Sequence, residues 1–223
     1  MLSFILGVSF PSKVTLMRTL CYCAISLLAC AACVRQPSLP ANSTYNVIGM
    51  LNDTAWYGTG KVLRIKEPNQ QQLEDVRQFN LVIFTDIDYA GMGGGPNPNT
   101  NNGCLDPECT KTQSLVIYNI PLKKGRTTIA KLNKRRKLKH EYASLSYIGN
   151  AGGLYKRYIY KGLKPGWIRV TKFDRASGTV EGHFSITFNE DMGVYARLQN
   201  GMPETARFTD GLFRIKIKDV LLR

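Results

Sequence analysis

Two aspartates near the middle of the chain are the residues best suited to bind a cation. Asp86 and Asp88 stand at the end of an expected strand, and the two-residue period of a strand places both carboxylates on one face. Carboxylate oxygens are the ligands of a hard cation such as calcium. The segment lacks the regular oxygen spacing of a calcium loop, so a strand end beside a solvated loop is the favoured interpretation. Residues 89–113 form a long irregular loop, which is typical of a binding element or of disorder.

A polar strand face later in the chain carries residue types that hydrolases use. Glu181, His183, Ser185 and Thr187 alternate with apolar residues and therefore share one face of an expected strand. Neighbours on such a face lie about 7 Å apart, beyond direct hydrogen-bond reach. The sequence contains no nucleophile elbow, no metal-binding His pair and no phosphate loop. We therefore expect a solvated sheet face, no catalytic site and no cofactor.

Cys104 and Cys109 are the two cysteines of the expected folded part, and such a pair can form a disulfide or bind a metal. Their spacing closes a small loop, and a disulfide would form if the chain is exported to an oxidising compartment. A zinc site needs two more Cys or His ligands, and the only histidines, His140 and His183, lie far along the chain. The pair therefore predicts a disulfide and not a metal site.

The cysteine with the most specific surroundings is Cys30. It lies in an uncharged run, 19–34, which is shorter than the roughly 20 apolar residues of a membrane-spanning helix and fits the apolar region of a secretory signal. Residues 27–30, Leu-Leu-Ala-Cys, resemble the bacterial lipobox. The resemblance implies that the Cys30 thiol receives a diacylglyceryl group and that the chain is cut after Ala29. A start at Met17 would give the more ordinary signal.

Basic residues are concentrated between residues 110 and 140, where ten Lys and Arg occur without an acid. The net charge of the whole chain is +14. A run of four basic residues is expected in a turn, where it would be solvated or would contact acidic lipid head groups or anionic glycan. A nucleic acid is not an expected partner of an exported chain. The four residues are Lys134, Arg135, Arg136 and Lys137.

Alternation of apolar and polar residues predicts an all-β fold. In residues 179–189, five apolar or glycine positions alternate with polar ones, as in a half-buried antiparallel strand. Short strands separated by turn residues indicate a single antiparallel β-sandwich, jelly-roll-like, or a lipocalin-like barrel. A helical turn is expected only around residues 70–77. The other expected strands are 45–51, 56–65, 79–87, 114–120, 127–132, 142–148, 154–160, 166–173, 194–198 and one containing Phe213, Ile215 and Ile217.

These signals divide the chain into three parts. Residues 1–29 are an expected signal peptide, and residues 30–44, rich in Pro, Ser and Asn, are an expected tether between the lipid and the domain. Residues 45–223 are expected to form one all-β domain without an internal repeat.

Four short motifs within the expected domain resemble those of a group of bacterial proteins. Residues 52–56, 166–174, 177–184 and 208–213 follow in the order seen in the cell-envelope lipoproteins of unknown function common in Bacteroidota. In these proteins an exposed turn precedes a Trp. A pair of strands late in the chain carries a glycine followed by a Phe, and then a final strand with the sequence Gly-x-Phe. The resemblance implies an all-β lipoprotein of the cell envelope and brings no catalytic residue with it.

The function expected from these features is a non-enzymatic binding or scaffolding role at the cell envelope. In the lipoproteins that the chain resembles, a run of acids just after the acylated cysteine accompanies display on the outer face, and here no acid occurs before Asp53. The resemblance therefore implies that the lipid on Cys30 holds the protein on the outer membrane, facing the periplasm. One alternative is an enzyme acting on envelope glycan, with two of Asp86, Asp88 and Glu181 facing one cleft. Another is a lipocalin-like carrier of a small apolar ligand, which needs a cavity inside a closed barrel.

Overall fold

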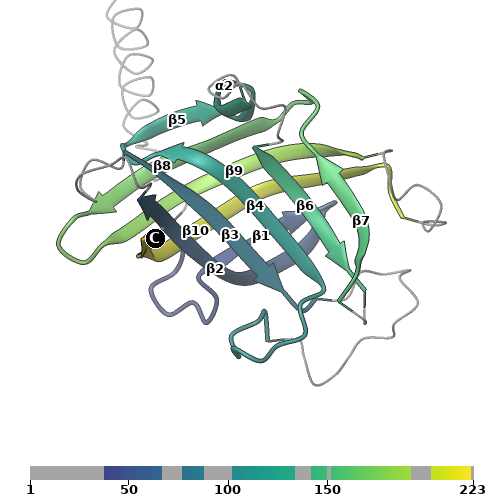
Figure 1. The fold of residues 1–223 in the computed structure, drawn as a ribbon, viewed down its shortest axis with the longest axis horizontal. Helices are drawn as coiled ribbons and strands as arrows, with labels where there is room; N and C mark the ends of the chain where they lie inside the picture. The colour runs from purple at the N-terminus through teal and green to yellow at the C-terminus, as the bar shows by residue number, and fades with distance from the viewer. Residues whose placement is uncertain are drawn as a thin grey trace, which may run out of the picture. The chain divides into compact units, whose positions relative to one another are not determined.

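The computed structural model describes residues 38–66, 77–87, 102–133, 142–149, 152–191 and 202–221 (Figure 1). Residues 38–223 form one compact unit, which is almost entirely β-structure. Its elements are β1 (Val47–Leu51), β2 (Thr54–Lys66), β3 (Gln78–Thr85), β4 (Gln113–Pro121), β5 (Gly125–Thr128), α2 (Ile129–Asn133), β6 (Ala143–Ile148), β7 (Leu154–Ile159), β8 (Gly166–Asp174), β9 (Thr179–Glu190) and β10 (Thr205–Leu221).

Strand pairing closes the sheet into a ring. Neighbours pair in the order β2, β3, β4, β6, β7, β9 and β10, and β10 returns to β2. This last contact is parallel, with Ile217 opposite Val62 and Asp219 opposite Arg64. β1 pairs with both β2 and β10, whereas β8 takes the second edge of β9 and carries β5 beyond it. The predicted all-β class is confirmed, in a ring-like arrangement.

The seam between β7 and β9 is the shortest contact in the ring. Only Tyr158 with Glu190 and Ile159 with Asn189 pair there. Side chains reinforce it, because the Nζ of Lys156, whose side chain is 1% exposed, lies 2.9 Å from Oε2 of Glu190. The hydroxyl of Tyr158 also donates to the carbonyl of Pro203 at 2.6 Å. Side chains therefore supply much of what holds this seam.

The expected strand positions agree with the structure except in one segment. The strands expected at 45–51, 56–65, 79–87, 114–120, 142–148, 154–160, 166–173 and 179–189 are confirmed to within two residues at each end. The prediction of a strand at 127–132 was wrong, because β5 ends at Thr128 and helix α2 follows. The strand expected at 194–198 and the helical turn expected before Arg77 lie outside the described residues.

The helix replaces the strand because its two apolar residues fit a helical spacing as well as an alternating one. Ile129 and Leu132, three residues apart, lie on one face of a helix and are both fully buried. The Thr128 hydroxyl accepts a hydrogen bond from the Lys131 amide at 3.3 Å, which caps the first turn. α2 packs between β4 and β8, where β8 diverges from the ring.

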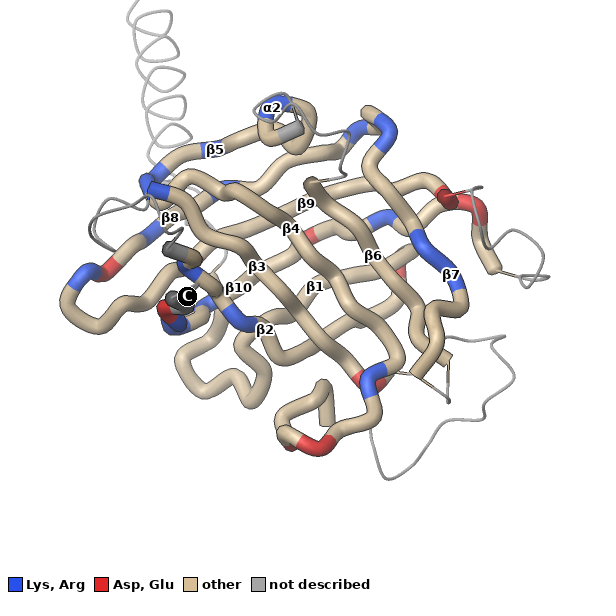
Figure 2. Tube along the Cα trace, viewed as in Figure 1, with Lys and Arg blue, Asp and Glu red and all other residues tan. Residues whose placement is uncertain are grey.

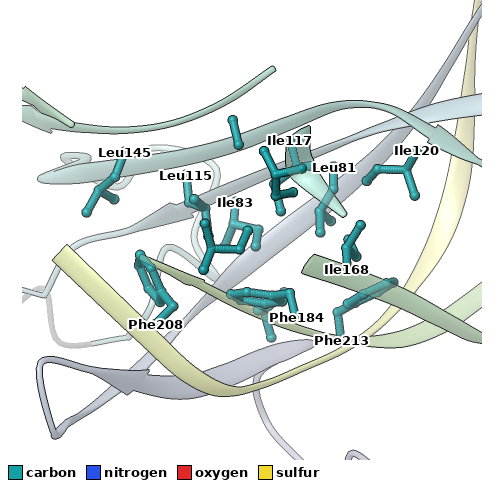
Figure 3. Close-up of a cluster of buried hydrophobic side chains, with 14 of the residues drawn as sticks. Leu81, Ile83, Leu115, Ile117, Ile120, Leu145, Ile168, Phe184, Phe208 and Phe213 are labelled. Carbon is teal, nitrogen blue, oxygen red and sulfur yellow. The ribbon is translucent and has the colours of Figure 1, made fainter. Parts of the chain in front are cut away.

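Inward-facing side chains fill the ring. Apolar residues from β3, β4, β8, β9 and β10 meet in the interior (Figure 3). Phe208 is the centre of an aromatic cluster, with its ring centroid 5.0 Å from that of Trp56 and 5.9 Å from that of Phe184. The Trp56 indole donates to the side-chain oxygen of Gln113 at 2.9 Å, so its polar atom is satisfied inside the core. Among the described residues, no helix has the length and apolar character needed to cross a membrane.

Gly182 marks a close approach between β9 and its neighbours. A Cβ at this position would lie 2.3 Å from the Arg169 carbonyl oxygen and 2.4 Å from the Phe213 ring. The backbone atom cannot move away without shifting β8. Gly182 is therefore fixed by the lack of space.

We expect Gly182→Ala to lower the free energy of unfolding by about 1–3 kcal/mol, the usual cost of overpacking a core. Urea denaturation measures this change. Gly153→Ala is the matched control, because a Cβ there meets nothing within 4 Å. Equal midpoints for the two variants would contradict the close approach.

Candidate functional site

A hollow lies at one end of the ring. It has a volume of about 920 Å³ and is formed where β2, β4 and β10 end and where β3 and β9 begin. Figure 2 shows Lys and Arg gathered around this end of β10, near the carboxyl terminus. Its lining residues are Arg64, Arg77, Leu122, Phe173, Arg175, Ala176, Ser177, Gly178, Thr179, Lys216, Ile217 and Asp219. We call this feature the basic hollow.

The strands position several of these residues by continuing their inward-facing rows past the core. Val62 of β2 is buried inside the ring, and two residues later Arg64 lines the basic hollow. In the same way the buried Phe79 is preceded by Arg77 on the same face. Leu122 and Ile217 extend the rows of β4 and β10 and keep them apolar. The basic hollow is thus the end of the filled interior, with an apolar floor and a cationic rim.

One cation of the rim is neutralised within the site. The Arg64 guanidinium binds the Asp219 carboxylate through two contacts, Nε to Oδ1 at 2.7 Å and Nη2 to Oδ2 at 3.0 Å. Such a bidentate pair fixes both side chains in one geometry. The parallel register of β2 and β10 places the two residues opposite each other. Of the lining residues that the structure describes, only Asp219 has a carboxylate.

The other three cations of the rim leave a positive charge at the basic hollow. Arg77, Arg175 and Lys216 are exposed, and none of them has an acidic partner among the described residues. Positive side chains around a concave surface concentrate the potential and attract anions. The described residues of the site therefore favour a negatively charged ligand electrostatically.

The turn between β8 and β9 forms one wall of the basic hollow. The Asp174 carboxylate accepts hydrogen bonds from the Ala176 amide at 3.0 Å and from the Ser177 hydroxyl at 2.9 Å. The hydrogen bond from Ser177 and those from the turn amides lower the pKa of Asp174. Gly178, with φ of +69°, completes the turn in a backbone region that favours glycine. The wall is thus held in shape by local hydrogen bonds.

Asp86, one of the two expected cation ligands, serves a structural role instead. Its carboxylate is fully buried and accepts hydrogen bonds from the amides of Gly103 at 2.7 Å and Asn102 at 3.2 Å. The described residues contain no group of three or more His, Cys, Asp or Glu that could hold a metal ion. Asp88 lies outside the described residues.

The loop that Asp86 holds contains the predicted disulfide. Cys104 and Cys109 are joined, with an S–S distance of 2.08 Å and Cα atoms 5.2 Å apart. Gly103 lies against the rings of Tyr45 and Tyr57, which stack with centroids 4.2 Å apart. Burial, the neighbouring Tyr45 and the negative charge of Asp86 together raise the pKa of Tyr57. The disulfide prediction is confirmed, and the loop is packed onto β2.

The polar face of β9 does not form a catalytic arrangement. Glu181 lies outside the ring, with Oε1 3.3 Å from Nε of Arg214 and 3.8 Å from Nζ of Lys172. It lies near the start of β9, whereas Asp86 follows the opposite end of β3, so the two carboxylates share no cleft. Burial, and then the charge of Arg169, lower the pKa of His183.

The expectation that this face is solvated was wrong for its second half. Ser185 and Thr187 are buried, and the Ser185 hydroxyl donates to the carbonyl of Phe208 at 3.1 Å. The segment before β8 covers them, since the Thr187 amide donates to the carbonyl of Pro165 at 2.7 Å. Alternation in the sequence shows which residues point outward but not what lies over them.

Several predicted site residues lie outside the described part of the chain. These are the acylation candidate and the four basic residues of the expected turn: Cys30, Lys134, Arg135, Arg136 and Lys137. The structure neither brings them to the basic hollow nor separates them from it.

Comparison with known proteins adds no relative. No protein-family model, no curated protein and no solved structure matches this chain. The resemblance to Bacteroidota lipoproteins stays a prediction, and the functional argument rests on the residues of this chain.

We expect Asp86→Ala to destabilise the protein by about 1.5–3 kcal/mol, because two backbone donors would lose a charged acceptor. Urea denaturation without reductant measures the loss. Asp106→Ala is the control, since Asp106 accepts one amide hydrogen bond in the exposed part of the same loop. Similar losses in the two variants would show that Asp86 does not hold the loop.

Proposed function

We propose that this protein is a lipid-anchored binding protein of the bacterial cell envelope, without enzymatic activity, that holds an anionic ligand in the basic hollow. The observation that carries the proposal is the set of three cations, Arg77, Arg175 and Lys216, around a concave site where the one carboxylate among the described lining residues is already paired. Guanidinium and ammonium groups are the usual partners of phosphate and carboxylate.

The floor of the site favours an anion that also has an apolar part. Leu122, Phe173 and Ile217 are partly buried and pack against the core of the ring. A ligand that covers them gains roughly 0.8 kcal/mol for each methylene group removed from water. An inorganic ion would use only the cationic rim, so an amphipathic anion matches more of the lining.

The filled interior argues against the two alternative functions. A carrier of a wholly apolar ligand needs space inside the ring, but core side chains such as Phe79, Phe184 and Phe213 occupy the described interior. A glycan hydrolase needs two carboxylates facing one cleft. Asp219 is the only carboxylate among the described residues that line the basic hollow, and it is bound to Arg64.

The cellular setting in this proposal comes from the sequence. Acylation of Cys30 would attach the protein to a membrane, and we place it on the outer membrane facing the periplasm. An anionic lipid or glycan of the envelope is then the available partner, and nucleic acid is not.

We expect the full protein to bind octyl phosphate and not the uncharged octyl glucoside, measured by isothermal titration calorimetry. The double variant Arg77→Ala/Lys216→Ala should bind octyl phosphate at least tenfold more weakly. Loss of a charged hydrogen bond costs about 1.5–3 kcal/mol, and about 1.4 kcal/mol corresponds to tenfold.

The control for this titration removes two positive charges elsewhere. Lys61 and Lys111 both lie over the ring of Phe84, away from the basic hollow. Lys61→Ala/Lys111→Ala should keep the wild-type affinity for octyl phosphate. Equal affinities of the two double variants for octyl phosphate would show that binding depends on net charge, and would refute the basic hollow as the binding site.

The anchor has its own test. Cells that express the wild-type chain and are fed a radioactive fatty acid should yield a labelled protein, whereas the Cys30→Ser chain should stay unlabelled. Equal labelling of the two chains would refute acylation at Cys30.

A further inference from the structure

The outer surface of β5, β8 and β9 carries a second group of cations, separate from the lining of the basic hollow. Strand register sets Arg126, Arg169 and His183 side by side across these three strands. Arg126 places its guanidinium carbon 4.4 Å from the centre of the Trp167 ring. We call the surface made by Arg126, Trp167, Arg169, Lys172 and Arg214 the Trp167 face.

Cations outnumber acids on this face. Arg126, Arg169 and Lys172 are exposed, and Arg214 is partly so. Among the described residues, the acids at this face are Glu181, which lies between Lys172 and Arg214, and Asp174 in the turn beyond. Trp167 is only half-buried. An indole among cations is the combination found where proteins meet the head-group region of a bilayer.

The amino-terminal segment reaches the domain at the same face. The Arg214 guanidinium donates to the carbonyl of Leu39 at 2.8 Å and to that of Pro40 at 3.4 Å. Leu39 itself is buried, although the sequence places residues 38–44 in the tether. The chain is therefore fixed to the domain beside Glu181 and Lys172.

The length of chain before this attachment limits the distance to the acyl group. Nine residues lead from Cys30 to Leu39, and a fully extended chain covers about 3.3–3.6 Å per residue, or roughly 30 Å. With the acyl group on Cys30, as in the proposed function, the edge of the Trp167 face at Arg214 is held within roughly 30 Å of the bilayer.

We propose that the Trp167 face docks on the surface of an anionic membrane. Arg126, Arg169 and Lys172 would contact lipid phosphates, and the Trp167 indole would enter the head-group layer. The inference rests on the acylated Cys30 of the proposed function, which fixes the face near the membrane. Docking then sets the orientation of the domain, while the lipid holds it in place.

The two tryptophans of the chain make this docking measurable. Trp167 lies on the proposed surface, whereas Trp56 is 2% exposed in the core and serves as an internal control. Protein extracted from membranes of expressing cells is reconstituted into vesicles whose lipids carry bromine near the head group, which quenches indole emission on contact. One set of vesicles is phosphatidylcholine, and the other contains phosphatidylglycerol as well.

We expect loss of most of the Trp167 emission on the anionic vesicles, little loss on phosphatidylcholine, and recovery at high salt because the contact is electrostatic. Trp167→Phe, which leaves only Trp56, should show no quenching on either membrane. Unquenched Trp167 on the anionic vesicles would overturn the proposal.

Two double variants with the same change of net charge distinguish docking by the Trp167 face from a general effect of net charge. Arg126→Glu/Arg169→Glu should abolish the quenching. Lys61→Glu/Lys111→Glu should keep it, because Lys61 lies in β2 and Lys111 just before β4, and β9 and β10 separate these strands from β8. Equal quenching in the two variants would also overturn the proposal. Intact mass of the same samples reports the acyl group on Cys30, so failure of the anchor and failure of the docking face are told apart.

Discussion

The closure of the sheet between β10 and β2 is the constraint on which the rest of the structure depends. β10 pairs with β9 from Thr205 to Lys216, and β1 pairs with both β10 and β2. From Ile217 onward β10 also lies directly beside β2, in parallel, and extends this closure to the end of β2. The same register sets Asp219 opposite Arg64 and so neutralises one cation of the basic hollow. The parallel pairing of β10 with β2 thus contributes both to the closure of the sheet and to the charge of the site.

The interior packing explains why the site lies at the end of the ring. Aromatic side chains around Phe208 fill the middle, and Gly182 is needed because β8 and Phe213 come too close for any side chain. These side chains occupy the described interior. Binding residues are consequently found where the inward-facing rows pass beyond the core, on strand ends that can change without disturbing it.

Local alternation predicted most of the strands but not the site. The strand at 179–189 could be recognised because Phe184, Ile186 and Phe188 alternate with polar residues over its whole length. The segment after Thr128 was predicted as a strand because Ile129 and Leu132 are compatible with the alternation of a strand as well as with the spacing of a helix. Arg64 and Arg77 were missed because a charge at a strand end looks like an ordinary surface residue. Each of these arginines continues a row of inward-facing apolar residues. This relation identifies them as site residues only when the arrangement of the strands in the ring is known.

The seam between β7 and β9 gives the ring a preferred place to open. Two residue pairs join these strands, against ten between β9 and β10, so separation there breaks the fewest backbone hydrogen bonds. Opening the seam would expose Lys156 and separate it from Glu190. The ion pair therefore opposes opening at the shortest strand contact of the ring. Amide hydrogens of β7 that face β9 should therefore exchange with solvent through local opening, whereas those of β9 that face β10 should exchange only on global unfolding. The ring is thus a curved sheet whose β7 and β9 edges are joined by two residue pairs and one ion pair.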